Sequence, residues 1–340
     1  MAYTTINKPS EYFNTKLYTG TGSSNSVTGV GFQPDWVWIK GRSTAPDHFL
    51  FDVVRGVTNS IRTNVPSATY TEAQLLTAFG SDGFTVGTNT NVNASSQTFV
   101  AWNWLANGAG VSNTDGDVTA TVSANQTSGF SIVKYVNPAS GSPFTVGHGL
   151  GSPPKMVITK NISTSQTWGV WHTGIGFGNY IRLDSTAAPS AANLVTATSN
   201  TTFSTYQNHH STGNEIIAYC FAEKKGFSKF GSYTGNGNAD GPFTYLGFKP
   251  AFVITKRTDA SGYHWQMWDN KRDSFNLVDL ALNANQGAVE YTETFGDFVS
   301  NGFKITGTNT NKNEAGGTYI YMAFAEEPLV GTNNIPATAR

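Results

Sequence analysis

Cysteine and charged residues are scarce in this sequence. Cys220 is the one cysteine among 340 residues, and its apolar neighbours at 216–221 indicate a buried small hydrophobe rather than a catalytic thiol. Charged residues account for 13%, and 21 Lys plus Arg almost balance 22 Asp plus Glu, which leaves a net charge of −1. Such a balance gives no electrostatic footprint for nucleic acid or an anionic membrane, so we expect no nucleic-acid partner.

Long apolar segments are also missing. No stretch approaches the roughly 18 apolar residues that span a bilayer, which argues against membrane insertion. The segment Met1–Ile6 lacks the basic and apolar regions of a secretory signal. We therefore expect synthesis and folding in the cytoplasm.

Recognisable catalytic and metal-binding motifs are absent too. None of the six histidines has the His-Glu-x-x-His spacing of zinc enzymes, and the Gly-x-Ser-x-Gly nucleophile elbow does not occur. We interpret His209 and His210 as part of a polar loop. The segment Asn113–Asp117 loosely resembles a calcium loop, but no bidentate Glu follows at the required position, so a linker turn is the preferred interpretation. We predict no metal and no cofactor.

Aromatic residues and glycine, by contrast, are plentiful. Aromatic residues reach 13%, too much apolar surface for a disordered chain. The 36 glycines, together with many Thr, Ser and Asn, favour strands and turns over helices. A chain of this length can form two or three domains that each bury a core without a disulfide or a metal.

An internal repeat organises the chain. Three segments place a proline six positions before a lysine with an apolar run between them: Gly31–Lys40, Gly151–Lys160 and Gly247–Lys256. This pattern indicates a turn that leads into a largely buried strand. The unequal intervals between the three lysines argue against a small-repeat solenoid and favour tandem domains.

Further blocks recur around these strands. A Tyr-Thr-Gly turn opens the first and third repeats, and a strand with alternating large apolar residues follows the lysine in all three. The segment Gly83–Asn91 recurs as Gly302–Asn311 but is missing from the middle repeat. The other blocks are Tyr18–Gly22 and Tyr233–Gly237, with a looser match at Tyr135–Pro138; His48–Asp52, Trp168–His172 and Trp265–Asp269; and Trp102–Ala106, Tyr219–Glu223 and Tyr321–Glu326.

Short strands separated by Gly, Asn and Ser turns are typical of antiparallel sandwiches. We predict an all-β fold of three tandem, related antiparallel β-sandwich modules, jelly-roll or lectin-like, with little helix. The best helical candidate is Tyr70–Phe79, with Thr71 as its cap. The polar or glycine-rich linkers give modules at residues 1–111, 112–226 (the divergent one) and 227–328, and a polar tail at 329–340.

Together the motifs resemble a known group of proteins. The Tyr-Thr-Gly turn, the Phe-x-Pro strand entry at Phe32 and Phe248, Asp52 with Arg55 after an aromatic strand, and the terminal Phe-Ala-Glu are the features concerned. They are similar to repeated domains in virion structural proteins of tailed phages, notably those of cyanobacterial hosts. The resemblance covers nearly the whole chain. It implies a tail-fibre, adhesin or head-decoration protein on the particle surface, with other virion proteins and copies of itself as partners.

The tryptophans are candidates for ligand contact, because aromatic faces stack on sugar rings and anchor protein interfaces. Four of them, Trp36, Trp38, Trp102 and Trp104, alternate along strands, which favours core positions. Two further pairs have a three-residue spacing, which places the members of each pair on opposite faces of a strand. We therefore expect one member of each pair to be open to solvent. These pairs are Trp168 with Trp171 and Trp265 with Trp268.

If the protein binds a glycan, the best candidate site is Trp265, Trp268, Asp269 and Arg272, where aromatic, carboxylate and guanidinium groups can contact a sugar together. The alternative is that Asp269 and Arg272 only pair with each other on a surface loop. The sequence leaves both interpretations open.

Three hypotheses for the function follow. An adhesin that binds a host-surface glycan predicts exposed aromatic residues at one end of each module. A capsid decoration or connector protein predicts large subunit contacts, as in a cyclic assembly, and no sugar affinity. A polysaccharide-degrading enzyme needs convergent carboxylates, yet Glu223, Glu326 and Glu327 lie at module ends, where they are expected to face water. Because repetition favours multivalent attachment over a single catalytic site, we predict a non-enzymatic protein.

Overall fold

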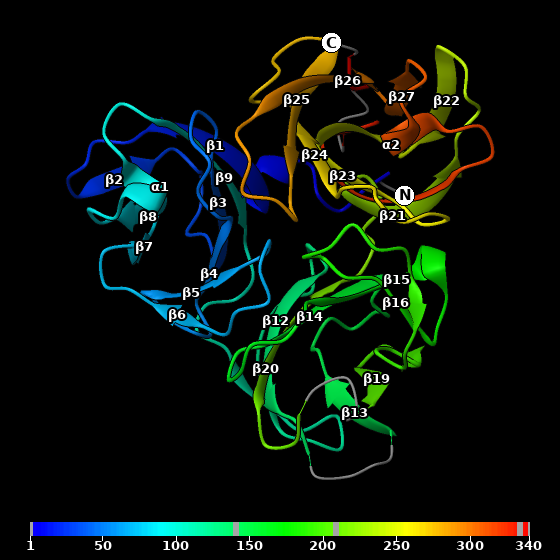
Figure 1. Cartoon of the computed structure of the whole chain (residues 1–340). Coiled ribbons are helices and arrows are strands. Elements are labelled where there is room, and N and C mark those ends of the chain that lie inside the picture. The colour runs from blue at the N-terminus through cyan, green and yellow to red at the C-terminus, as the bar shows by residue number, and fades with distance from the viewer. Residues whose placement is uncertain (1–2, 139–142, 207–210, 332–335, 339–340) are drawn as a thin grey trace.

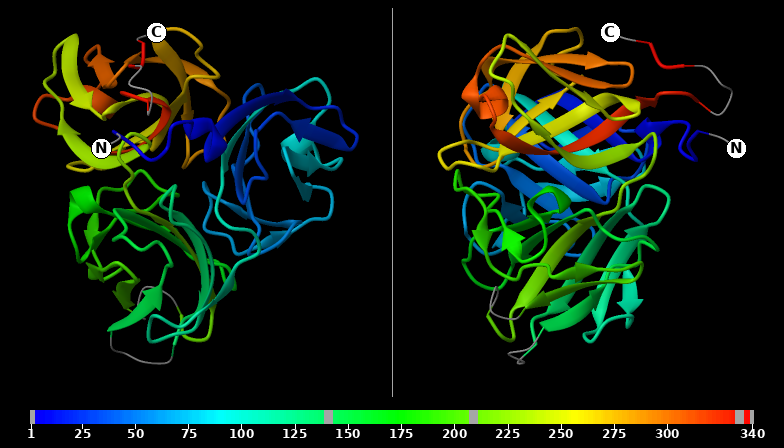
Figure 2. Two further views of the ribbon diagram at one scale, coloured as in Figure 1. Left: turned by 180° about the vertical axis from the view of Figure 1, so that it is seen from behind. Right: turned by 90° about the vertical axis from the view of Figure 1, so that its right-hand side faces the viewer.

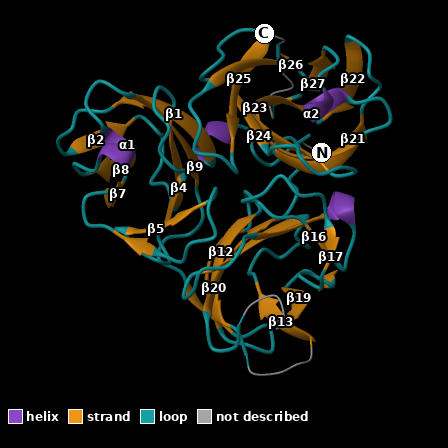
Figure 3. Cartoon of the chain, viewed as in Figure 1, coloured by secondary structure: helices purple, strands orange, loops and turns teal. Residues whose placement is uncertain are grey.

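The structure is a computed structural model that describes residues 3–138, 143–206, 211–331 and 336–338. It is nearly all β, with 48% of the residues in strands and 4% in helices, so the predicted all-β sandwich fold is confirmed. Figure 3 shows the helices as short turns between the strands. No helix in the described part of the chain is long and apolar enough to cross a membrane. The predicted polar loop at His209 and His210 lies outside the described residues.

The chain forms three lobes around a common centre (Figures 1 and 2). We define them by their strands as the first lobe (residues 13–104), the second lobe (111–221) and the third lobe (228–328). Each sheet contains strands of a single lobe, so the lobes meet through side chains and loops rather than through a shared sheet.

The first lobe follows the 3-10 helix η1 (Pro9–Glu11) and is a sandwich of two sheets. Its elements are β1 (Phe13–Thr19), β2 (Asn25–Thr28), β3 (Trp36–Gly41), β4 (Phe49–Asp52), β5 (Asn59–Arg62), β6 (Tyr70–Thr71), β7 (Leu76–Gly80), β8 (Gly83–Val86), α1 (Thr90–Asn93) and β9 (Thr98–Trp104). The larger sheet has the strand order β1-β9-β3-β4-β5-β6, and the smaller one has the order β2-β8-β7.

The second lobe repeats the larger sheet but has shorter strands opposite it. Its elements are β10 (Val111–Asn113), β11 (Ala120–Asn125), β12 (Phe130–Val136), β13 (Pro143–Gly147), β14 (Met156–Asn161), β15 (Gly169–His172), the 3-10 helix η2 (Thr173–Ile175), β16 (Asn179–Tyr180), β17 (Ser190–Ala191), β18 (Ala197–Thr198), β19 (Thr202–Tyr206) and β20 (Glu215–Phe221). The larger sheet has the order β10-β11-β12-β20-β14-β15, and β13-β19-β18 and β16-β17 are separate small sheets.

In the third lobe, one sheet of eight strands supplies both layers of the sandwich. Its elements are β21 (Ser228–Thr234), β22 (Asp240–Tyr245), β23 (Phe248–Arg257), β24 (Gln266–Asp269), β25 (Val278–Asn283), β26 (Tyr291–Val299), β27 (Gly302–Thr306), α2 (Thr310–Asn313) and β28 (Thr318–Pro328). The strand order is β21-β28-β23-β24-β25-β26-β27-β22. The apolar core of this lobe lies between the two halves of the sheet, since side chains of β23 and β28 pack there against those of β26 and β27.

The three strands β3, β14 and β23, which we call the inner strands, are buried along their whole length. Side chains alternate across a strand, so Trp36 and Trp38 of β3 point to one face while Val37 and Ile39 point to the other. The first pair joins a core shared by all three lobes, and the second pair joins the core of the first lobe alone. Burial on both faces explains why these strands are continuous apolar runs.

The shared core, which we call the central core, holds the three lobes together. Aromatic rings meet across each boundary: Trp36 with Tyr219 at 4.6 Å, Phe13 with Phe324 at 5.0 Å, and Phe221 with Phe324 at 6.1 Å between ring centres. The predicted core tryptophans are confirmed as core, and Cys220 is buried as expected. The lobes therefore form one packed body. The tryptophans of the central core are Trp36, Trp38, Trp102, Trp104, Trp168 and Trp265.

A buried asparagine links the two blocks that recur in the first and third lobes. Asn313, at the end of α2, accepts a hydrogen bond from the backbone N–H of Asn236, and its amide donates to the carbonyl of Gly307 at 2.7 Å. Asn93 makes the matching bonds at the end of α1. The Tyr-Thr-Gly turn and the closing block are thus held together by one side chain in each of these lobes.

The glycine of the Tyr-Thr-Gly turn is required by close backbone approach. A Cβ atom at Gly235 would lie 2.3 Å from the carbonyl oxygen of Glu314, and one at Gly20 would lie 2.1 Å from that of Ala94. In the second lobe the closing block is missing, and Asn137 stands at the glycine position. The glycine and the block it contacts are therefore absent together.

Two expectations need correction. The segment Tyr70–Phe79 is not a helix but contains β6, a turn and β7. Leu76 pairs with Val86 in the smaller sheet of the first lobe, and this pairing overrides the local helix propensity. The boundary expected after residue 111 falls inside β10, which pairs with β11 of the second lobe. The boundary expected after residue 226 falls between β20 and β21.

Replacing Asn313 tests the link between the two blocks. Asn313→Ala removes three partly buried hydrogen bonds of a buried side chain, so we expect the free energy of unfolding to fall by about 2–3 kcal/mol in urea denaturation. Asn311→Ala is the matched control, because the backbone N–H of Asn311 keeps its bond to Asn309 and the loss should stay near 0.5 kcal/mol. Equal losses in the two variants would contradict the role of Asn313.

Candidate functional site

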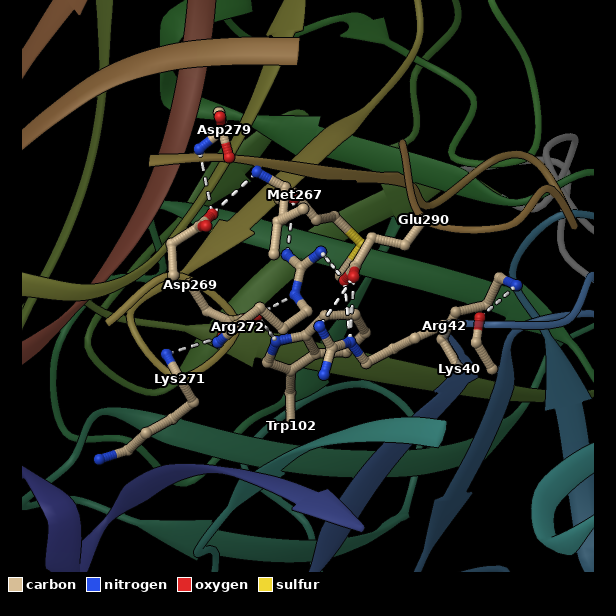
Figure 4. A network of polar contacts seen from close by, with 12 residues as sticks. Lys40, Arg42, Trp102, Met267, Asp269, Lys271, Arg272, Asp279 and Glu290 are labelled. Carbon is tan, nitrogen blue, oxygen red and sulfur yellow. Dashed lines mark hydrogen bonds and ion pairs between the residues drawn. The ribbon is translucent and has the colours of Figure 1, made fainter. Parts of the chain in front are cut away.

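A buried network of charged side chains lies between the third and first lobes (Figure 4). Asp269 ends β24 and accepts a hydrogen bond from Nε of Arg272 at 2.6 Å, and both side chains are 0% exposed. The turn after β24 fixes the carboxylate, because Oδ1 of Asp269 also accepts the backbone N–H groups of Lys271 and Arg272. Nη2 of Arg272 donates to the carbonyl of Met267 on the same strand, which fixes the guanidinium.

The first lobe contributes Trp102 and Arg42 to this network. Nε1 of Trp102 donates to Oδ2 of Asp269 at 3.0 Å, and the guanidinium of Arg272 lies 5.7 Å from the Trp102 ring centre. Glu290 accepts from Arg272 at 3.2 Å and from Arg42 at 2.8 Å. Burial lowers the pKa of Arg272, but the charges of Asp269 and Glu290 outweigh it and raise the pKa above its ordinary value.

The junction between the first and second lobes repeats this arrangement. Asp52 ends β4 and accepts from Nε of Arg55 at 2.6 Å, with side chains 0% and 2% exposed. The hydroxyl of Tyr219 in the second lobe donates to Oδ2 of Asp52 at 2.7 Å. Tyr219 occupies in β20 the position that Trp102 occupies in β9, as the registers against β14 and β3 establish.

The junction between the second and third lobes uses a histidine instead. His172 ends β15 at the position of the two aspartates, and Met322 stands where the other lobes have a Trp or Tyr donor. Nδ1 of His172 accepts the N–H of Gly174, so the ring proton lies on Nε2, which donates to the carbonyl of Tyr321 at 3.1 Å. Burial lowers the pKa of His172 to about 4, so the ring is neutral near pH 7.

Buried lysines reinforce the junctions. Lys40, Lys160 and Lys256, the three repeated lysines of the sequence, are each 0% exposed and donate to backbone carbonyls. Lys160 reaches the carbonyl of Pro66 in the first lobe, and Lys256 reaches that of Thr186 in the second. Burial lowers the pKa of all three ammonium groups to about 8.

The predicted site residues Trp265, Trp268, Asp269 and Arg272 are all buried, so they present no open surface to a glycan. The structure brings Asp269 and Arg272 together but separates the two indoles. Trp265 lies in the central core and donates to the carbonyl of Arg182, whereas Trp268 packs on the opposite face against the ring of Phe295 at 4.3 Å. The alternative interpretation was right about the ion pair and wrong about the surface loop.

The expectation that one tryptophan of each pair is exposed is wrong. Trp168, Trp171, Trp265 and Trp268 are at most 2% exposed. The three-residue spacing does place the members of a pair on opposite faces, but the central core covers one face and the core of the lobe covers the other. No local pattern in the sequence indicates that both faces of these strands are covered.

Both Asp–Arg pairs were named from the sequence, but their equivalence was missed, and Glu290 was missed altogether. Asp52 with Arg55 and Asp269 with Arg272 share an Asp-x-x-Arg motif at the end of equivalent strands, and this repetition was the signal that could have identified the two pairs as equivalent. Glu290 carries no comparable signal, because no repeated motif contains it.

Candidate metal ligands are not gathered anywhere in the described part of the chain. In the segment that loosely resembles a calcium loop, the carboxylate of Asp117 accepts from the N–H and the hydroxyl of Thr145, which lowers its pKa. Asp115 accepts from the amide of Asn113 at 2.8 Å. These carboxylates hold the connection between β10 and β11, so the segment lies inside the second lobe and is not the linker that the sequence predicted.

Two pockets open beside the junctions. The pocket between the first and second lobes has a volume of about 250 Å³, and the ion pair of Lys134 with Glu215 at 3.0 Å forms part of its wall. The pocket between the third and first lobes has a volume of about 360 Å³. It is lined by Asn14, Thr15, Lys16, Leu17, Gly29 and Lys271.

Comparison with known proteins identifies one family. The family model described as Domain of unknown function (DUF7483) matches residues 8–328. No curated protein and no solved structure gives a significant match. The match spans all three lobes of this chain.

Breaking the buried ion pair should be far more costly than breaking an exposed one. In Arg272→Met, Asp269 is left buried without its partner, so we expect the free energy of unfolding to fall by about 3–5 kcal/mol in urea denaturation. Arg62→Met is the control, because its ion pair with Asp47 is partly exposed and should contribute at most about 1 kcal/mol. A loss in Arg272→Met no larger than in the control would contradict the proposed role of the pair.

His172 should make the fold sensitive to acid. Because its pKa falls from 6.5 to about 4 on folding, the unfolded chain binds more protons between these pH values, and stability decreases as the pH falls through this window. His172→Gln should reduce that decrease by up to about 3 kcal/mol in unfolding measured at several pH values. The other buried histidines remain in both proteins, so their contribution cancels. Parallel pH profiles for the two proteins would refute this prediction.

Proposed function

The chain belongs to the DUF7483 family, and from its geometry we propose that it is a non-enzymatic surface protein of a virus particle, of the tail-fibre or adhesin type. In this proposal the three-lobed body is a rigid support, and pockets and loops at its surface bind the host surface or other particle proteins. The resemblance of the repeated motifs to virion structural proteins of tailed phages supports the particle context.

One observation carries the proposal. The repeated polar residues that an enzyme would use, namely the Asp-x-x-Arg pairs, His172 and the buried lysines, contact backbone groups and the neighbouring lobe. The side chains of the Asp-x-x-Arg pairs are 0–2% exposed, and the residues His172, Lys40, Lys160 and Lys256 are 0–1% exposed. Acids and bases that are fixed in this way have no access to a substrate, which favours a structural role for the repeat.

A second candidate function is capsid decoration or connection. It is favoured by large apolar side chains on the surface of the third lobe, where Phe275 is 78% exposed and Leu277 is 51% exposed. Phe243 and Tyr245 of β22 are each 48% exposed. Exposed aromatic and aliphatic side chains are typical of protein–protein contacts, so this surface suits another particle protein or a second copy of the chain.

Binding and mass measurements test the two functions together. We expect fluorescently labelled protein to bind intact cyanobacterial cells or a glycan array saturably, without releasing reducing ends from the bound polysaccharide. Its mass in solution is measured in parallel by light scattering. Release of reducing ends would refute the non-enzymatic proposal.

Phe275→Ser with Leu277→Ser distinguishes the second function from the first. Oligomers that dissociate in this double variant, combined with no binding to cells or glycans, would favour decoration or connection. Saturable cell binding that is unchanged in the double variant would favour the adhesin.

A further inference from the structure

We propose that the pocket between the third and first lobes, lined in part by Thr15, Lys16 and Lys271, binds an acidic saccharide. The proposal rests on the proposed attachment function and names the class of glycan recognised. The volume of about 360 Å³ lies within the range of pockets that bind small molecules. Two separate elements form its walls, since Lys16 belongs to β1 and Lys271 to the turn after β24.

The charge of this pocket is positive. Lys16 and Lys271 line it, and no carboxylate does. Among the described residues, neither ammonium group has an acidic oxygen within 4.0 Å. Figure 4 shows the side chain of Lys271 directed away from the Asp269–Arg272 pair. Asp82, whose charge interacts with that of Lys16, accepts hydrogen bonds from the backbone N–H groups of Gly29 and Gly31.

A buried hydroxyl gives an independent sign of a ligand. Thr15 is 4% exposed, and its Oγ1 has no hydrogen-bond partner in the described structure. A buried polar atom without a partner is costly, so such atoms in native proteins usually bond to a ligand or to water. Thr15 lines both this pocket and a smaller adjoining one of about 40 Å³, and its enclosed hydroxyl can bond to a ligand group or a water that enters the smaller pocket.

The equivalent junction between the first and second lobes provides an internal comparison. Ile132 occupies the position of Thr15, because Ile132 is registered against Tyr219 as Thr15 is against Trp102. Val54 occupies the position of Lys271, because Val54 follows Asp52 by two residues as Lys271 follows Asp269. Among the described residues that line that pocket, the cations are Lys134, which is paired with Glu215, and Arg55, which is paired with Asp52. Thr15 and Lys271 therefore stand where the first–second junction has the apolar residues Ile132 and Val54. Leu17 stands where that junction has Lys134.

These groups match a sugar that carries a carboxylate or a sulfate. Two ammonium groups attract the anion, and the Thr15 hydroxyl can bond to it or to a ring hydroxyl. The apolar side chain of Leu17 and the lysine stems offer a surface for the C–H face of a pyranose. A neutral sugar would leave the two ammonium groups without a partner, so charge provides the selectivity.

Calorimetric titration of the full chain with trigalacturonic acid, and with maltotriose as the neutral control, tests the proposal. We expect saturable binding of the acidic trisaccharide, which weakens as salt is raised, and no measurable binding of maltotriose. Lys16→Gln with Lys271→Gln should weaken the affinity by roughly tenfold or more, and Thr15→Val should weaken it severalfold without any change of charge.

Lys134→Gln, in the pocket of the equivalent junction, is the matched control and should leave the affinity unchanged. Melting temperatures confirm that each variant is folded. Affinity that is unchanged in the double lysine variant, or equal affinity for maltotriose, overturns the proposal. Inorganic sulfate that binds as tightly as the trisaccharide also overturns it, because the site would then recognise only a small anion.

The same titration separates failure of this site from failure of the proposed function. If the chain binds cyanobacterial cells or arrayed glycans but the double lysine variant binds them equally well, the pocket assignment is wrong and the attachment function stands. If the chain binds neither cells nor glycans, the attachment function is wrong, and with it the proposal for the pocket.

Discussion

Burial of the inner strands on both faces is the constraint on which the rest of this structure depends. One face of β3, β14 and β23 packs inside its own lobe, and the other face carries large side chains such as Trp36, Met156 and Phe252 into the central core. A single lobe would leave that second face in water, which a soluble domain tolerates poorly. Three lobes are therefore needed to cover one another, and the chain is stable as one body.

Apolar packing is not directional, so it does not by itself determine how each lobe is oriented against the next. Polar contacts between the lobes provide this orientation. Each lobe ends an equivalent strand with a polar side chain that bonds to the next lobe: Asp52 to Tyr219, His172 to the carbonyl of Tyr321, and Asp269 to Trp102. The three contacts run in the same direction around the centre, so the arrangement closes on itself. A buried carboxylate such as Asp52 or Asp269 is costly when its hydrogen-bond partner is misplaced. This cost disfavours any other orientation of the lobes.

Much of the fold could be predicted from the sequence, because alternation and turn residues are local signals. The repeated Pro-to-Lys segments identified β3, β14 and the greater part of β23, and the alternating tryptophans identified core positions. The helix at 70–79 was predicted wrongly, since the pairing of β7 with β8 is a tertiary contact. The opposite faces of Trp265 and Trp268 were predicted, but their burial was not. Trp265 is covered by lobes that lie far apart in the sequence, and Trp268 is covered by the second layer of its own lobe.

Comparison of equivalent positions in the three lobes distinguishes residues that hold the fold from residues that are free to bind a ligand. Where the junctions are buried, a change in one lobe is matched in the next: His172 replaces an aspartate, Met322 replaces the donor, and the bond passes to a backbone carbonyl. At the third–first junction, Thr15 and Lys271 replace apolar residues, and the Thr15 hydroxyl has no hydrogen-bond partner among the described residues. Such changes do not serve packing. Because the closed body already fixes both walls of that pocket, a ligand there binds with little ordering cost, which makes the pocket the favourable place for recognition.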